Sequence, residues 1–95
     1  MINKNRNVEP LLKQLLRSGT SIGANITEAQ NAYTKKDFIN KLGISLKEAR
    51  ESEYWIRPLI TTNYLDKNES DSIQKDCEEL IKLLTTIIKS SKKNI

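Results

Sequence analysis

Histidine is absent from this sequence of 95 residues. Its absence excludes the usual general base near neutral pH, the commonest metal ligand, and every nucleophile that depends on a histidine partner. The one cysteine, Cys77, can form neither an internal disulfide nor a zinc site, and it fits the reducing cytoplasm. We therefore expect a cytoplasmic protein that is not an enzyme, takes no small-molecule substrate, and holds neither a metal nor another cofactor.

Turn-forming and aromatic residues are also scarce. Three glycines, two prolines and five aromatic residues are too few for an all-β domain of this length. No apolar run approaches the ~20 residues that cross a membrane, and residues 1–10 lack the apolar stretch of a signal peptide. Hydrophobic residues make up 37% of the chain, which is enough to fill one core. Composition thus predicts a single helical domain with no membrane contact.

Apolar residues recur at intervals of three and four from residue 12 to residue 33, which is the spacing of one face of an α-helix. This stripe comprises Leu12, Leu15, Gly19, Ile22, Ile26, Ala29 and Tyr33. Pro10 suits the first turn of a helix, where its missing N–H costs nothing. We predict a helix over residues 10–32, preceded over residues 1–9 by a polar N-terminal tail or the remnant of a first helix.

Two glycines weaken the middle of this predicted helix, because each costs about 1 kcal/mol relative to alanine in a helix interior. A helix that keeps them should gain something in return, and the available gain is the close approach of another backbone. We therefore predict close helix packing over Gly19, Gly23 and Ala24. The alternative is a loop over residues 18–21.

A second apolar stripe predicts a helix from residue 35 to at least residue 57. The stripe comprises Phe38, Leu42, Ser45, Ala49, Ser52, Ile56 and Leu59. Thr34 and Asp37 have the spacing of a capping box at its start. Pro58 must kink or end the helix, and a kink is favoured because Leu59 and Ile60 continue the stripe.

A third stripe predicts a helix that begins at a cap near Asn68 or Ser70 and ends near Ser90 or Lys92. The stripe comprises Ile73, Cys77, Leu80, Leu84 and Ile87. Short turns between long helices imply antiparallel neighbours. We predict an all-α domain over residues 10–92, an up-down antiparallel bundle of three long helices, with a C-terminal tail over residues 93–95.

A row of polar side chains lies beside the apolar stripe of the first helix. It comprises Arg17, Ser21, Asn25 and Glu28. Such rows usually face water. The alternative is a half-buried network in which Arg17 pairs with Glu51 of the second helix, while Ser21 and Asn25 complete the hydrogen bonds.

Three segments carry a resemblance to a known family. They are Gln14–Ala29, which contains the sequence Arg-Ser-Gly-Thr-Ser-Ile-Gly-Ala-Asn-Ile-Thr-Glu-Ala, then Lys36–Ile39, and Lys47–Ile56. Together they resemble the bacterial four helix bundle proteins encoded in intervening sequences of large-subunit ribosomal RNA genes. The match is close over residues 11–60, and the third helix follows the family only in pattern.

The resemblance implies more than the residues show by themselves. Distant relatives of the family are accessory proteins of diversity-generating retroelements, which assemble into a barrel-shaped homopentamer and engage RNA and a reverse transcriptase. The resemblance therefore implies a homo-oligomer, with a pentamer as one option, and RNA or another nucleic acid as its partner. Family members also carry an amphipathic helix before the segment that starts at Pro10, so the resemblance implies an apolar groove for a sister chain to fill.

Lysines gather in two stretches of the sequence and are the candidate nucleic-acid-binding residues. They are Lys35, Lys36, Lys41, Lys89, Lys92 and Lys93. Lysines on a helix are most often a solvated face, but in an oligomer they could concentrate enough charge to bind phosphates. Tyr33, Tyr54 and Trp55 could stack on bases, although aromatic residues at helical spacing more often pack. We expect a self-associating nucleic-acid-binding protein; the alternative is a protein-protein adaptor or a purely structural oligomer.

Overall fold

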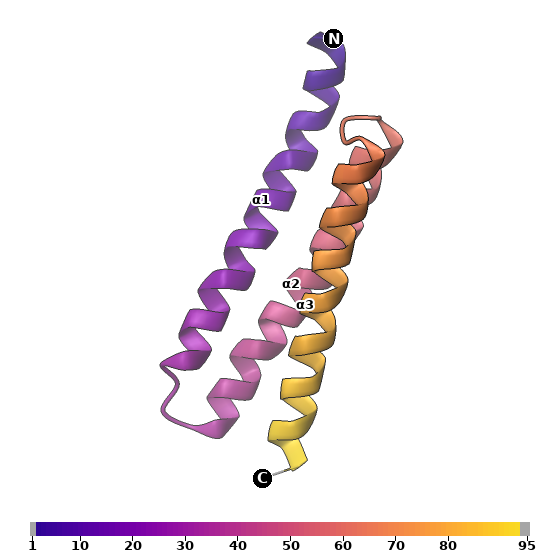
Figure 1. Ribbon diagram of the computed structural model, residues 1–95. Coiled ribbons are helices and arrows are strands. Elements are labelled where there is room, and N and C mark those ends of the chain that lie inside the picture. The colour runs from indigo at the N-terminus through magenta and orange to yellow at the C-terminus, as the bar shows by residue number, and fades with distance from the viewer. Residues whose placement is uncertain (1, 94–95) are drawn as a thin grey trace.

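The computed structural model describes the backbone of residues 2–93 and the side chains of residues 9–93. It contains three long helices joined by short turns: α1 (Ile2–Gln30), α2 (Lys35–Thr61) and α3 (Lys67–Lys93). Successive helices run in opposite directions, and the described residues form no strand (Figure 1). The predicted all-α, up-down antiparallel fold is therefore confirmed.

The first helix begins earlier than predicted. It starts at Ile2 rather than residue 10, so Pro10 lies inside α1. Residues 2–9 are helical, and they continue α1 instead of forming the polar tail or the separate remnant of a first helix that were the two expectations. A helix that has already formed extends at the cost of one residue per hydrogen bond, even without burying a side chain. The helix is also continuous through residues 18–21, which excludes the predicted alternative of a loop there.

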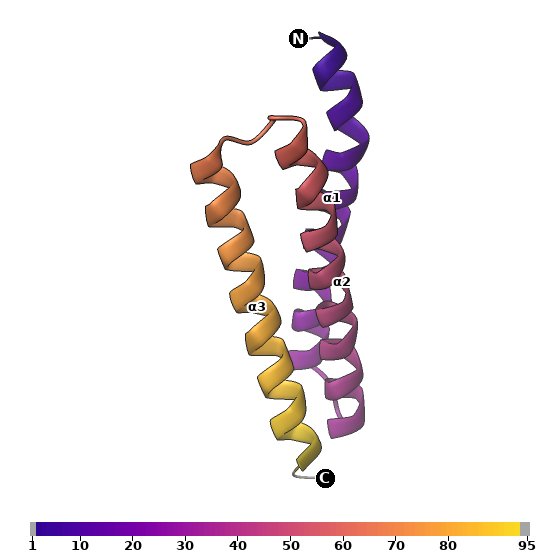
Figure 2. The same cartoon turned by 90° about the vertical axis from the view of Figure 1, so that its right-hand side faces the viewer.

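The middle helix, α2, makes the contacts that hold the three helices together. It packs against α1 on one side and α3 on another, whereas no Cα atom of α1 lies within 8 Å of one in α3 among the described residues. Figures 1 and 2 show the resulting elongated shape, which measures 53 × 20 × 14 Å. The backbones of α1 and α3 therefore do not approach each other closely, although Leu84 of α3 lies in the same buried core cluster as Ile22 and Ala29 of α1.

Small side chains make the contact between α1 and α2 close. Ser18 and Ser45 are completely buried, and the Ser45 hydroxyl donates a hydrogen bond of 2.9 Å to the backbone carbonyl of Ile22. A serine side chain is short, so this bond requires the two backbones to lie near each other. The buried core beside this contact comprises Ile22, Ala29, Leu42, Ala49 and Leu84.

The start of α2 agrees with the prediction, and the start of α3 corrects it. The Thr34 hydroxyl accepts a bond of 3.0 Å from the Asp37 N–H at the start of α2. At α3, the cap is Asp66 rather than Asn68 or Ser70. Its carboxylate accepts a bond of 2.8 Å from the Glu69 N–H, and the Glu69 carboxylate accepts one of 3.1 Å from the Asp66 N–H. This is a complete capping box, which satisfies two backbone donors at once.

The helix also continues through Pro58, as predicted, and α2 ends at Thr61. Asn63 then adopts a left-handed backbone conformation with φ of 61°. The Asn63 N–H donates to the Ile60 carbonyl at 3.0 Å, and the Tyr64 N–H donates to the Leu59 carbonyl at 3.1 Å. This pair of bonds is a Schellman cap, and asparagine is one of the few residues that tolerate the conformation it needs.

Candidate nucleic-acid interface at one end of the molecule

The antiparallel order of the helices brings the two lysine-rich stretches to the same end of the molecule. The α1–α2 turn and the C-terminal end of α3 lie together at the bottom of Figure 1. We call this the basic end, and define it as residues 28–41 and 85–93. It contains all six candidate lysines: Lys35, Lys36, Lys41, Lys89, Lys92 and Lys93.

The basic end carries the whole positive excess of the chain. Of 16 Lys and Arg residues in the chain, six lie here, and of 12 Asp and Glu residues, Glu28 and Asp37 lie here. The net charge of this end is therefore +4, equal to that of the whole chain, and the charges elsewhere cancel. Five of the lysine side chains are exposed and Lys41 is half-buried. The positive field is thus concentrated at one place and is accessible to polyanions.

The turn at the basic end holds an aromatic side chain whose environment differs from the prediction. The apolar stripe of the first helix includes Tyr33, but its side chain is fully exposed (101%). The prediction is wrong because α1 ends at Gln30 and Thr34 already caps α2, so Tyr33 belongs to neither helix. The sequence contained a signal for this outcome: because Thr34 has the spacing of an N-cap, Tyr33 precedes the second helix and lies outside its apolar stripe.

A polar network links α1 to α2 near the middle of the molecule. Arg17 forms ion pairs with Glu51 and with Glu48, the latter at 3.3 Å between Nη1 and Oε2. Its Nε donates to the Gln14 side-chain oxygen at 3.2 Å, and the Trp55 indole N–H donates to Glu51 at 3.1 Å. The expected Arg17–Glu51 pair is present, and the sequence missed the roles of Gln14, Glu48 and Trp55. The arrangement clamps the two helices together by placing one cation between two carboxylates of α2.

The other members of the predicted polar row stay outside this network. The Asn25 side chain donates to the Ser21 carbonyl at 2.9 Å and to the Ser21 hydroxyl at 3.3 Å, both within α1. Glu28 is exposed and lies within the basic end. The row places these residues on successive turns of α1, and Arg17 is the member that pairs with the carboxylates of α2.

One face of α1 is uncharged and uncovered. We call it the open face, and it comprises Leu12, Leu15, Leu16, Gly19, Thr20 and Gly23. All of these except Gly23 line a shallow surface hollow of about 500 Å³, and Leu16 is 72% exposed. A Cβ atom added to Gly19 or Gly23 would meet nothing within 4 Å, and Ala24 is exposed. The predicted close packing over these three residues is therefore not made within the chain; Ser18 and Ser45 make the close contact instead.

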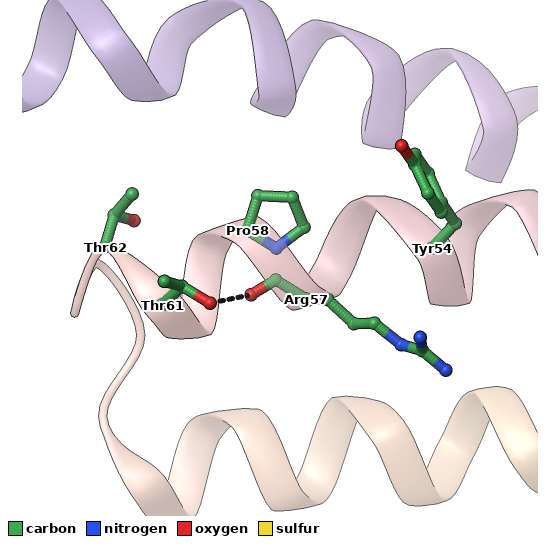
Figure 3. Close-up of a pocket in the computed structure, with 5 residues that line it drawn as sticks. All are labelled: Tyr54, Arg57, Pro58, Thr61 and Thr62. Atoms are coloured by element: carbon green, nitrogen blue, oxygen red, sulfur yellow. Dashed lines mark hydrogen bonds between the residues drawn. The ribbon is translucent and has the colours of Figure 1, made fainter.

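A second hollow, of about 350 Å³, lies along the C-terminal half of α2. Its lining residues are Tyr54, Arg57, Pro58, Thr61 and Thr62 (Figure 3). The Tyr54 and Pro58 rings point to the side of α1, and the Arg57 side chain points to the side of α3. The Thr61 hydroxyl donates a bond of 3.1 Å to the Arg57 carbonyl. The hollow contains one cationic side chain, that of Arg57, and one phenol, that of Tyr54.

The cysteine is a packing residue. Cys77 is buried, and its thiol donates to the Ala49 carbonyl of α2 at 3.2 Å. Burial raises the pKa of this thiol, and the charges of Glu53 and Glu78 raise it further. The thiol therefore stays protonated and weakly nucleophilic at neutral pH. The side chains of residues 9–93 contain no cluster of acidic or cysteine groups that could hold a metal ion.

None of the described helices is both long and apolar enough to span a bilayer. The fold and its surface define a class of helical protein in which three antiparallel helices share one core and gather lysines at one end. Within that class, the chain belongs to the 23S rRNA-intervening sequence protein family, whose model matches residues 3–86. The family resemblance seen in the sequence is thereby confirmed.

A solved structure shares this fold. It is the crystal structure of a protein with unknown function from the S23 ribosomal protein family of Bacteroides thetaiotaomicron. The two chains are 51% identical and superpose with a TM-score of 0.81, and the match covers 92% of this chain and 83% of the other. No curated protein matches the chain.

Proposed function

We propose that this protein is a non-enzymatic, self-associating helical protein of the cytoplasm that binds RNA through its basic end. The observation that carries the proposal is the convergence of six lysines, from two stretches about 50 residues apart in the sequence, on an end that holds the entire net charge of +4. The match to an rRNA-intervening sequence family supports RNA as the polyanion.

The physical basis is the release of counterions. Each phosphate that a lysine neutralises frees condensed cations from the nucleic acid, and this release drives association without reading any base sequence. Lysine suits such a role because its ammonium is a compact charge on a flexible stem. The lysines of one chain are few, so several chains must contribute to strong binding. Five copies, as the pentameric relatives suggest, would carry a charge of about +20.

The open face of α1 supports self-association. An uncharged helix face with a leucine that is 72% exposed is unfavourable in water, and its small residues allow another helix to approach closely. Every copy of the chain presents the same face. A sister chain would therefore cover exposed apolar surface of α1, including Leu16.

The test of RNA binding uses labelled RNA at several salt concentrations. We expect affinity to fall steeply from low to moderate salt. The variant Lys89→Gln/Lys92→Gln/Lys93→Gln should bind at least tenfold more weakly. Its salt slope should be smaller by about 1 for each phosphate that the variant no longer neutralises.

The matched control changes three other lysines of the same helix, Lys67→Gln/Lys75→Gln/Lys82→Gln, and removes the same charge outside the basic end. We expect this control to bind less than about threefold more weakly than wild type, because screening weakens charges beyond roughly 10 Å from the bound phosphates. Equal weakening in the two triple variants would contradict binding at the basic end. The absence of salt-dependent binding would contradict the RNA-binding proposal altogether.

The second candidate function is a protein-protein adaptor or a structural oligomer without nucleic-acid binding. The open face of α1 favours it, because this face can pair with another helix whether or not RNA is present. Light scattering on the wild-type protein together with the RNA titration separates the two functions. A stable oligomer that ignores RNA at low salt would support the adaptor or structural role.

A further inference from the structure

Tyr33 occupies an unusual position for a large aromatic residue. Its side chain is fully exposed, whereas the other exposed tyrosines, Tyr54 and Tyr64, keep part of their surface against the protein. The Tyr54 ring contacts the Trp55 ring edge to face, with 5.0 Å between the ring centres. A single exposed apolar residue needs no special explanation. Tyr33 differs from such a residue because it lies within the basic end, where an exposed ring and exposed lysines occur together.

The backbone on both sides of Tyr33 is held by hydrogen bonds. Before it, the Ala32 N–H donates to the Ala29 carbonyl at 3.1 Å, which ties the turn to the end of α1. After it, Thr34 caps α2, and the Phe38 N–H donates to the Thr34 carbonyl at 3.0 Å. The ring can therefore move mainly about its two side-chain torsions, and little entropy is lost when a ligand holds it.

Two lysines follow this exposed ring in the sequence, and one carboxylate, Asp37, lies in the same helical turn. Lys35 and Lys36 follow it directly in the first turn of α2, where the helix dipole adds partial positive charge. The lysines at the end of α3 lie at the same end of the molecule. A ring presented among cations matches the chemistry of a nucleotide, whose base stacks on an aromatic face while its phosphate meets an ammonium.

The turn at the other end of the molecule lacks this combination. Tyr64 is only 41% exposed, and two acidic residues, Asp66 and Glu69, form the cap that follows it. The first turn after Tyr64 thus has two carboxylates and one lysine, Lys67, whereas the first turn after Tyr33 has two lysines and one carboxylate, Asp37. The two turns therefore provide an internal comparison between tyrosines whose neighbouring charges sum to opposite signs.

We propose that the basic end binds single-stranded RNA and that Tyr33 stacks on an unpaired base while the lysines of this end neutralise the adjoining phosphates. This inference rests on the proposed function and deepens it, because charge alone does not distinguish single strands from duplexes. The bases of a duplex are stacked on each other, so their faces are unavailable to Tyr33. Recognition is of a base face and does not select a sequence.

The test compares wild type with Tyr33→Ala and Tyr33→Phe. The probes are an unstructured labelled RNA of about 12 nucleotides, the corresponding blunt RNA duplex, and inorganic polyphosphate, which has charge but no bases. We expect Tyr33→Ala to bind the single strand about 5- to 150-fold more weakly, the range that one stacked base contributes. Affinities for the duplex and polyphosphate should change less than twofold, and Tyr33→Phe should bind as wild type does.

Two further measurements keep the test decisive. Tyr64→Ala is the matched control, and it should retain single-strand affinity within twofold. Fluorescence of a 2-aminopurine base in the RNA reports stacking directly, and it should be quenched by wild type and Tyr33→Phe but not by Tyr33→Ala. Circular dichroism should show that all variants keep their helices, since the Tyr33 side chain is fully exposed.

The outcomes separate this inference from the proposed function. Salt-dependent binding that is equal for wild type and Tyr33→Ala, or binding that favours the duplex, would overturn the stacking role and leave the basic end as an electrostatic site. If wild type binds none of the RNA probes, the proposed function fails and the stacking role fails with it. Binding of polyphosphate alone would overturn base recognition and point to a simple anion site.

Discussion

The two faces of α1 differ in their surroundings: one packs against α2, and the other is exposed to solvent. The face toward α2, which we call the closed face, carries Arg17, Ser18 and Ile22, and its polar groups are paired within the chain. The open face carries leucines, glycines and a threonine; Leu12 and Leu15 are half-buried, and Leu16, Gly19, Thr20 and Gly23 are exposed. The closed face thus completes its polar contacts within the chain, and the open face leaves apolar surface exposed. That surface is available for another molecule.

Placing a charge on the open face is expected to have the largest effect. Leu16→Glu should weaken self-association at least tenfold, because burying a leucine is worth roughly 1.5–3 kcal/mol and a buried unpaired carboxylate costs more. Light scattering across a range of concentrations measures the change. Asn40→Glu, which adds the same charge at an exposed position of α2, is the control and should assemble normally. If wild type stays monomeric at every concentration, the open face is not a self-association surface.

Removing the clamp on the closed face is expected to have the next largest effect. Arg17→Ala should lower the free energy of unfolding by about 1–2 kcal/mol, since it leaves two neighbouring carboxylates without their cation. The side chain of Glu48 is 14% exposed, but that of Arg17 is 48% exposed, so the decrease should stay below that of a fully buried pair. Urea unfolding measures it. Arg17→Lys should fall between wild type and Arg17→Ala, because one ammonium cannot reproduce the guanidinium contacts with Glu48 and Glu51.

Substitution of a glycine on the open face should stabilise the folded chain but weaken its self-association. Gly23→Ala should raise the free energy of unfolding by roughly 0.5–1 kcal/mol, because alanine favours the helix and the added methyl group meets no atom within 4 Å. The same methyl group should weaken self-association if a sister helix packs closely there. Thermal unfolding of the dilute protein and light scattering report the two effects separately. A stabilised chain with unchanged assembly would place the contact away from Gly23.

The smallest expected effect lies at the α2–α3 contact, away from both faces of α1. Because the pKa of Cys77 is raised on folding, its thiol ionises in the unfolded chain at a lower pH than in the folded chain. The unfolded chain then binds fewer protons, so the free energy of unfolding falls as pH rises above the ordinary cysteine range, by less than about 1.4 kcal/mol per pH unit. Below that range the effect vanishes.

Cys77→Ala is the reference for this measurement, since it removes the titrating group and keeps the lysines. The difference in unfolding free energy between wild type and Cys77→Ala should therefore be constant below about pH 8 and shrink above it. A difference that does not depend on pH would show that Cys77 titrates alike in both states.

The sequence predicted α2 best and the ends of helices worst. The stripe from Phe38 to Leu59 and the cap at Thr34 were sufficient because a regular spacing and a local hydrogen bond are properties of adjacent residues. The start of α1 was wrong because proline is favoured in a first turn and disfavoured in a helix interior, and α1 nevertheless continues through Pro10 to Ile2. The cap of α3 was wrong because several polar residues precede it, and only the structure shows that Asp66 and Glu69 bond to each other.

In the candidate sites, too, the sequence predicted what depends on regular spacing and missed what depends on where helices end and how they are rotated. Arg17 and Glu51 could be paired from their spacing, because both lie at the edge of an apolar stripe. The close-packed residues could not be chosen correctly, since Gly19 and Ser18 are adjacent and a rotation of about 100° around the helix axis decides which of them meets α2. The environment of Tyr33 was wrong for a similar reason: whether the helix ends before it or after it decides between burial and full exposure.

By itself, the amino-acid sequence determined that this protein is all-α, that three amphipathic helices form it, that it carries no histidine chemistry, and which family it resembles. These properties follow from composition and from periodicity along the chain. Only the tertiary structure decided that the lysines converge, that α1 keeps an open face, and that Tyr33 stands in solvent among cations. Such properties depend on the relative placement of helices, which is set by packing between residues far apart in the chain and is not encoded in any single segment.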